Sequence, residues 1–132
     1  GKKGYIFTIG DEMTPHGLRQ SDITRVFCFC PHDAPSFYTP EQLLSMAEEK
    51  YHVFHVVVEE GDYARRRLQA VHSDWTRLMG DHAIFLKNQH HLSEVITAVI
   101  RVNEGQDVEE VIASYATDAQ TSVRHALFGV SQ

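Results

Sequence analysis

Several features that define other classes of protein are scarce in this chain. It has only two cysteines, Cys28 and Cys30, which lie too close together for an ordinary structural disulfide. So few cysteines are typical of a reduced cytoplasmic protein, the compartment that we expect. No stretch reaches the roughly 18 consecutive apolar residues of a membrane helix, and the start of the chain lacks the apolar core of a signal peptide. We therefore expect no membrane partner.

Basic residues are also in the minority. The chain has 12 Lys and Arg against 18 Asp and Glu, which gives a formal charge of −6. This charge repels a phosphate backbone and argues against a nucleic-acid partner, whereas divalent cations or basic partners fit better. Glycine-rich phosphate-binding patterns are absent. The short basic run at residues 65–67 is interpreted as a solvated helix face rather than a phosphate site.

The apolar residues follow strand-like and helix-like patterns in alternation. β-branched and aromatic runs predict buried strands at residues 4–10, 53–58 and 83–86. Helical spacing predicts helices near residues 21–28, 40–51, 62–79, 93–105, 107–115 and 118–128. Strands separated by helices pair in parallel through right-handed crossovers. The sequence therefore predicts an α/β layered fold with parallel strands.

Carboxylates follow two of the predicted strands. Asp11 and Glu12 come after the first strand, and Glu59, Glu60 and Asp62 come after the second. Ligands and metals gather beyond the carboxyl ends of parallel strands. Two interpretations of Asp11 and Glu12 stay open: metal ligands, or a solvated strand end where Asp11 caps a turn. The later three acids are interpreted as helix caps and partners of the helix dipole, with Asp62 at the cap.

Other reactive side chains carry weaker signals. Cys28, Cys30, His32 and Asp33 offer zinc-type ligands, but their spacing is shorter than that of structural zinc sites and no second ligand pair follows. A catalytic thiol is not expected there either, because adjacent loop residues rarely reach the geometry of a nucleophile and its base. The nine histidines are interpreted as surface or satisfied core residues. Trp75, at helical spacing, is expected to anchor the core.

The order of elements, the strand end at residues 5–12 and the strand at residues 53–58 resemble a known family. They are similar to the C-terminal half of the von Willebrand factor type A domain of bacterial proteins, over residues 4–104. The resemblance implies a Rossmann-like three-layer fold, in which residues 1–105 are the C-terminal portion of such a domain and residues 106–132 a helical extension. It also implies that the chain is a fragment whose first strands lie upstream.

The resemblance also implies a metal site in the intact domain. The family binds Mg²⁺ at a metal-ion-dependent adhesion site, through an Asp-x-Ser-x-Ser loop, a threonine and an aspartate after its fourth strand. Only the aspartate has a counterpart here, Asp11, and it follows Gly10 where the family has Thr-Asp-Gly. The Asp-x-Ser-x-Ser loop is absent from this sequence. We therefore expect Asp11 to be a Mg²⁺ ligand in the intact domain and no tightly bound cofactor in this chain alone.

These features lead to one expected function and two alternatives. The first is a noncatalytic module that binds a protein partner through the metal, and the resemblance makes an AAA-type ATPase a candidate partner. The second is a flavodoxin-like or phosphotransfer-type enzyme with Asp11 as metal ligand or nucleophile, and the third is a structural or oligomerising domain. We also expect self-association, through the unpaired edge of the strand at residues 5–9 or with the helices at residues 107–129.

Overall fold

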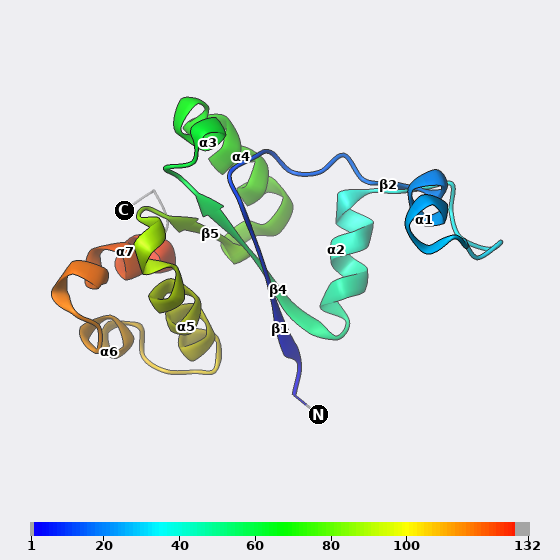
Figure 1. The fold of residues 1–132 in the computed structure, drawn as a ribbon. Helices are drawn as coiled ribbons and strands as arrows, with labels where there is room; N and C mark the ends of the chain where they lie inside the picture. Colours follow the sequence, from blue (N-terminus) through cyan, green and yellow to red (C-terminus); the bar gives the residue numbers. More distant parts are fainter. Residues whose placement is uncertain (1, 129–132) are drawn as a thin grey trace. The chain divides into compact units, whose positions relative to one another are not determined.

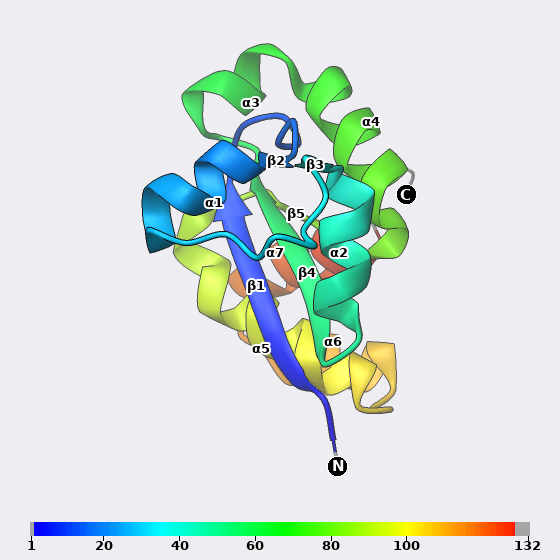
Figure 2. The ribbon, with the colours of Figure 1, turned by 90° about the vertical axis from the view of Figure 1, so that its right-hand side faces the viewer.

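The structure, a computed structural model, describes residues 2–128. Its main sheet has the strand order β1–β4–β5 and its strands are parallel (Figure 2). These strands span Gly4–Gly10, Tyr51–Val58 and Ala83–Leu86. All three lie where the apolar runs predicted them, so the α/β fold with parallel strands is confirmed. The chain forms two compact units that divide β1 and β4 between them.

The first unit takes the start of β1, residues 14–50 and the start of β4. Its further elements are β2 (Leu18–Arg19), α1 (Gln20–Phe27), β3 (Phe37–Tyr38) and α2 (Pro40–Glu48). The second unit takes residues 7–13 and the chain from Phe54 onward. Its further elements are α3 (Asp62–Arg66), α4 (Leu68–Met79), η1 (Gly80–His82), η2 (Gln89–His91), α5 (Leu92–Asn103), α6 (Val108–Ala113) and α7 (Thr117–Phe128).

The start of α2 in the first unit is set by local hydrogen bonds. The Thr39 hydroxyl accepts the Gln42 N–H at 3.1 Å, and the Gln42 side chain accepts the Thr39 N–H at 2.8 Å. Pro40 occupies the first helical position, where no N–H is needed. These reciprocal bonds satisfy donors that a helix start otherwise leaves unpaired, so this boundary is readable from sequence.

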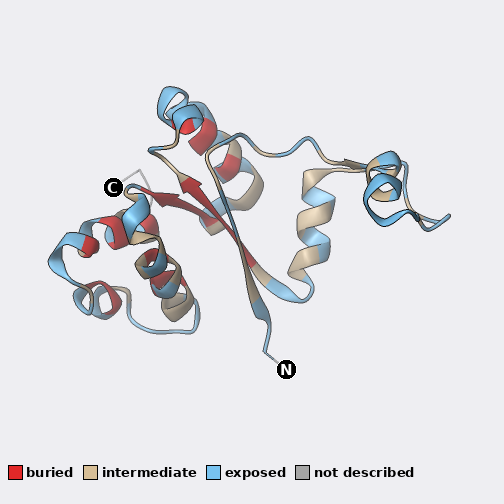
Figure 3. Ribbon diagram, in the orientation of Figure 1, coloured by how far each residue is buried: buried red, intermediate tan, exposed pale blue. Residues whose placement is uncertain are grey.

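The apolar side chains of helix α1 remain exposed to solvent. The helix ends at Phe27 as the sequence indicates, but no residue within this described helix is buried (Figure 3). Val26 is 67% exposed and Phe27 is 73% exposed. Helical periodicity identified the face correctly and could not tell whether another segment would cover it. A two-residue antiparallel ribbon, β2 with β3, was not predicted because so short a strand carries no periodic signal.

The second unit has its core around β4 and β5. These strands pair from His55 and Ala83 to Val58 and Leu86, and buried residues concentrate in them (Figure 3). Helix α4 covers one face of the pair, and α5 and α7 cover the other (Figure 1). Burial on both faces explains why the two runs lack alternating polar residues.

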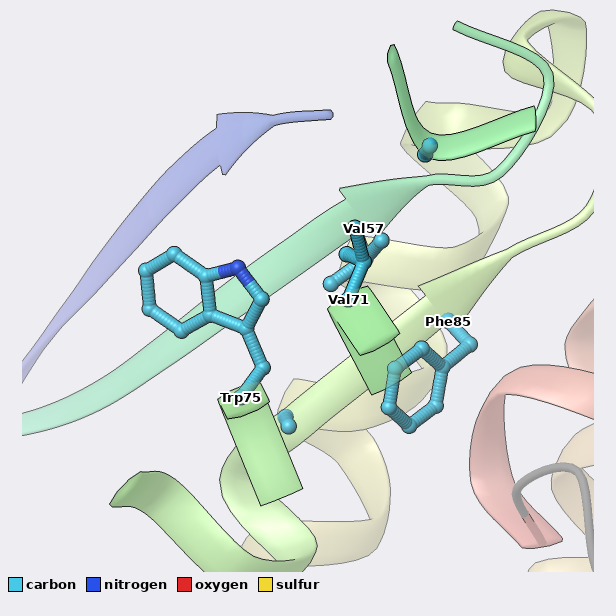
Figure 4. Close-up of a cluster of buried hydrophobic side chains, with 6 residues drawn as sticks. Val57, Val71, Trp75 and Phe85 are labelled. Carbon is cyan, nitrogen blue, oxygen red and sulfur yellow. The ribbon is translucent and has the colours of Figure 1, made fainter. Parts of the chain in front are cut away.

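One buried cluster joins α4 to the sheet. Val71 and Trp75 of α4 pack with Val57 of β4 and Phe85 of β5 (Figure 4). Trp75 is only 7% exposed, which confirms it as a core anchor. Each such side chain contributes about 1.5–3 kcal/mol through burial, so the cluster is a main reason why α4 stays on this face.

The helix predicted over residues 62–79 is in fact two helices. The backbone leaves the helical region at Arg67, with φ −133° and ψ 38°, so α3 ends and α4 begins there. Asp62 is not the cap that the sequence suggested, because Gly61 holds that position and Asp62 is already helical. Gly80 ends α4 with a positive φ of 59°, as expected of a glycine after a helix.

The C-terminal part of the second unit follows the sequence pattern closely. Asp107 caps α6 by accepting the Glu110 N–H at 3.1 Å, and α6 and α7 pack with α5. The domain boundary at residue 105 stays a prediction, and the last part of the expected extension, residues 129–132, lies outside the described residues. None of the described helices has the length and apolar character needed to cross a bilayer.

Candidate functional site

Asp11 follows β1 and caps a helix from far away in the sequence. Its Oδ2 accepts the backbone N–H of Tyr63 at 2.9 Å, in the first turn of α3. This bond replaces the cap that Asp62 does not provide. This contact supports the interpretation of Asp11 as a capping residue at the end of the strand. Its role as a metal ligand stays a prediction.

A glycine allows Asp11 to come this close. A Cβ atom built on Gly61 would lie 2.5 Å from both Cβ and Oδ2 of Asp11, a distance that real Cβ atoms do not reach. The backbone at residues 61–63 therefore clamps one carboxylate oxygen. The second oxygen, Oδ1, makes no hydrogen bond or ion pair with the described residues.

Glu12 does not join Asp11 in this arrangement. Its backbone carbonyl accepts the indole N–H of Trp75 at 2.8 Å, which links the end of β1 to α4. Glu12 itself is exposed. The two adjacent acids therefore do not form a pair of ligands at this edge.

Glu59, at the carboxyl end of β4, lies between two histidines. Its Oε1 is 2.7 Å from Nε2 of His125 on α7, and its Oε2 is 2.5 Å from Nε2 of His72 on α4. The second is a short polar contact whose geometry is not that of a hydrogen bond, since His72 Nε2 has no hydrogen-bond partner among the described atoms. The Glu59 side chain is only 10% exposed. One buried carboxylate thus links the helices on both faces of the sheet.

The acids after β4 meet the expectation of helix caps and dipole partners only in part. Asp62 lies in the first turn of α3, where it suits the helix dipole, and pairs with Arg65 three residues on at 3.0 Å. Glu60 accepts the backbone N–H of Gln89, the first residue of η2, at 2.5 Å. The partners of Glu59 and Glu60 are distant in sequence and were not indicated by spacing. The signal that could have been used is His72 itself, a polar residue three positions before Trp75 on the apolar face of its helix.

His55 is a buried histidine inside β4. Its ring stacks on Trp75 with 3.5 Å between centroids, and its Nδ1 shares a 2.7 Å hydrogen bond with the Thr8 hydroxyl. Its Nε2 has no partner among the described residues. Burial lowers the pKa of His55 from 6.5 to about 4, because the charged ring would lose its hydration. The expectation that the core histidines are satisfied is therefore only half met here.

The described residues hold no complete metal centre. Within residues 2–128, no three His, Cys, Asp or Glu side chains are grouped so that they could bind a metal ion. Cys28 and Cys30 are free thiols, the first exposed and the second half-buried. Comparisons of the chain with protein-family models, with curated proteins and with solved structures found no match.

The low pKa of His55 predicts a loss of stability in mild acid. Below pH 6.5 the unfolded chain binds a proton that the folded state takes up only near pH 4, so the free energy of unfolding falls as the pH drops between these values. From pH 7 to pH 5 this histidine should cost about 1–2 kcal/mol. Urea unfolding at the two pH values measures the loss.

The matched variants are His55→Gln and His32→Gln, the second at an exposed position. The first should reduce the difference between pH 7 and pH 5, and the second should retain it. An unchanged difference in His55→Gln would show that this histidine is not the group responsible.

Removing the charge of Glu59 should destabilise the second unit. In Glu59→Gln, the buried His72 and the half-buried His125 lose the carboxylate that lies between them, and we expect a loss of about 3 kcal/mol in the free energy of unfolding. Glu109→Gln provides the control, because its carboxylate pairs with Arg124 on the exposed surface, where ion pairs contribute little. Equal urea midpoints for the two variants would refute the importance of the buried contact.

Proposed function

We propose that this chain is a noncatalytic protein-recognition module of the von Willebrand factor type A kind. Asp11 contributes one ligand to a divalent metal, preferably Mg²⁺, and the other ligands come from residues outside this chain. The supporting observation is the state of the Asp11 carboxylate: one oxygen is held by the N–H of Tyr63, and the other has no partner among the described residues.

The coordination chemistry of Mg²⁺ fits a carboxylate that has one oxygen hydrogen-bonded and the other without a partner. The ion prefers oxygen ligands in an octahedron, keeps several waters, and uses only one or two carboxylates of its protein. An orientation fixed by Gly61 and Tyr63 lowers the cost of presenting Oδ1 to the ion. A remaining position on the metal then accepts a carboxylate from the partner protein.

The other polar groups at this edge favour recognition over catalysis. Glu59 and Glu60 are engaged by protein donors, and the Asn88 side chain accepts the N–H of His90. A phosphotransfer enzyme with Asp11 as nucleophile would need such groups free to act on a substrate. The resemblance extends the proposal to an AAA-type ATPase as candidate partner, and the low cysteine content extends it to a cytoplasmic setting.

The metal role of Asp11 is tested by calorimetric titration with Mg²⁺ and Mn²⁺. The chain alone should bind at about millimolar level, and a longer protein that supplies the proposed Asp-x-Ser-x-Ser loop should bind more tightly. Asp11→Asn should abolish the tighter binding, and Gly61→Ala should weaken it because the new methyl group displaces the carboxylate.

Glu12→Gln is the matched control, since it removes the same charge from the neighbouring, exposed residue. It should leave metal affinity nearly unchanged. Binding by the longer protein that survives Asp11→Asn, or no binding at all, would refute the proposed metal role.

We also propose that the chain associates with itself through β1. This strand is at the end of the sheet order and contains no charged residue or proline, the features that normally protect an edge from pairing. Ile9 within it is 49% exposed. An apolar, uncharged edge strand is a template for a strand from a second copy.

Sedimentation velocity over a range of concentrations tests the association. Ile9→Lys places a charge on the edge strand and should shift the chain toward monomer. Met46→Lys, on α2 at a residue 52% exposed, adds the same charge to a residue that is not part of β1 and should not. A wild-type chain that stays monomeric at high concentration would contradict the proposal.

A further inference from the structure

A basic corner lies where α3 meets α4. Arg65, Arg66 and Arg67 are all exposed, and a surface hollow of about 480 Å³ is lined by Asp62, Tyr63, Arg66 and Arg67. Helix α3 ends and α4 begins at Arg67, where the backbone leaves the helical region (Figure 1).

The arginines of the corner differ in how they are paired. Arg65 binds Asp62 at 3.0 Å, so these two charges neutralise each other. The Arg67 guanidinium lies over the Tyr63 ring, 5.3 Å from its centroid, and its donors make no hydrogen bond or ion pair with the described residues. Arg66 makes no hydrogen bond or ion pair with the described residues. The hollow therefore carries two positive charges that no carboxylate of the described chain balances.

Apolar surface accompanies these charges. Tyr63 is 36% exposed and Leu68, the first residue of α4, is 38% exposed. Arginine and tyrosine are the residue types most enriched among energetically dominant positions of protein interfaces. We call the surface formed by Tyr63, Arg66, Arg67 and Leu68 the arginine corner.

We propose that the arginine corner docks an acidic segment of a partner protein, one in which glutamate or aspartate alternates with an apolar side chain. Carboxylates of the segment bind the Arg66 and Arg67 guanidinium groups, whose planar donors match carboxylate geometry. The apolar side chain packs on Tyr63 and Leu68. This docking needs no metal and is therefore separate from the metal role of Asp11.

The charge of the whole chain favours a protein segment over a polyanion. A formal charge of −6 repels an extended nucleic acid or an anionic lipid surface, whose fields act over the whole molecule. A short acidic segment meets mainly the local field, because salt screens charges more than about 8–10 Å away. A compact group of two arginines with adjacent apolar surface suits such a segment.

Fluorescence anisotropy with a labelled peptide of alternating Glu and Leu tests the proposal, with EDTA present to remove divalent metal. The full chain should bind it, and the same peptide with Gln in place of Glu should bind at least about tenfold more weakly. Affinity should fall as salt is raised. Since EDTA removes the metal, failure here leaves the Asp11 proposal standing, and failure of the metal titration leaves this one standing.

Two double variants with the same loss of charge locate the surface. Arg66→Gln with Arg67→Gln should weaken peptide binding by about tenfold or more. Arg25→Gln with Arg77→Gln, which removes two exposed arginines elsewhere, should change it less than about twofold. Circular dichroism confirms that both variants are folded, because all four side chains lie at the surface.

Three results would overturn the proposal. The first is no binding of the Glu-Leu peptide, and the second is an equal loss in both double variants. The third is binding of phosphatidylserine vesicles or duplex DNA through Arg66 and Arg67 as tight as that of the peptide, which would make the corner a general anion surface.

Discussion

The burial of β4 on both faces is the constraint on which the second unit depends. Val56 and Val57 are fully buried, with α4 on one side and α5 and α7 on the other. A strand enclosed in this way leaves polar side chains room mainly at its ends. Glu59 directly follows the last residue of β4, and there it contacts a histidine from the helices on each side of the sheet. The same enclosure keeps His55 neutral, because its ring lies under Trp75.

The acidic residues at the carboxyl edge of the sheet differ in what they bind. Glu59 and Glu60 are held by groups of the chain itself and stabilise the fold. Asp11 is held at one oxygen by the N–H of Tyr63, and its Oδ1 has no partner among the described residues. Beyond it, α3 carries arginines that face solvent. The proposed metal ligand and the basic surface lie at the start and end of one short helix, and this is why both proposals place an acidic partner at this part of the second unit.

The three strands of the main sheet and most helix boundaries were predictable from particular residues. Thr39, Pro40 and Gln42 specify the start of α2, Gly80 ends α4, and Asp107 starts α6. The break at Arg67 was not predictable, because arginine is a good helix former and nothing near it in the sequence interrupts the helical pattern. Asp11 was identified as important from its place after a strand, but its contact with Tyr63, 52 residues away, depends on the packing of β1 beside β4.

The sequence by itself determined the class of fold, since hydrophobic periods and capping residues act over a few positions and need no distant partner. Only the tertiary structure decided which acids are bound and which are available. Glu59, His72 and His125 come together because β4, α4 and α7 pack at one edge of the sheet. Their spacing in the sequence does not indicate this contact. A carboxylate looks the same in sequence whether it is buried between histidines or open to a metal, and the difference in free energy arises from its surroundings.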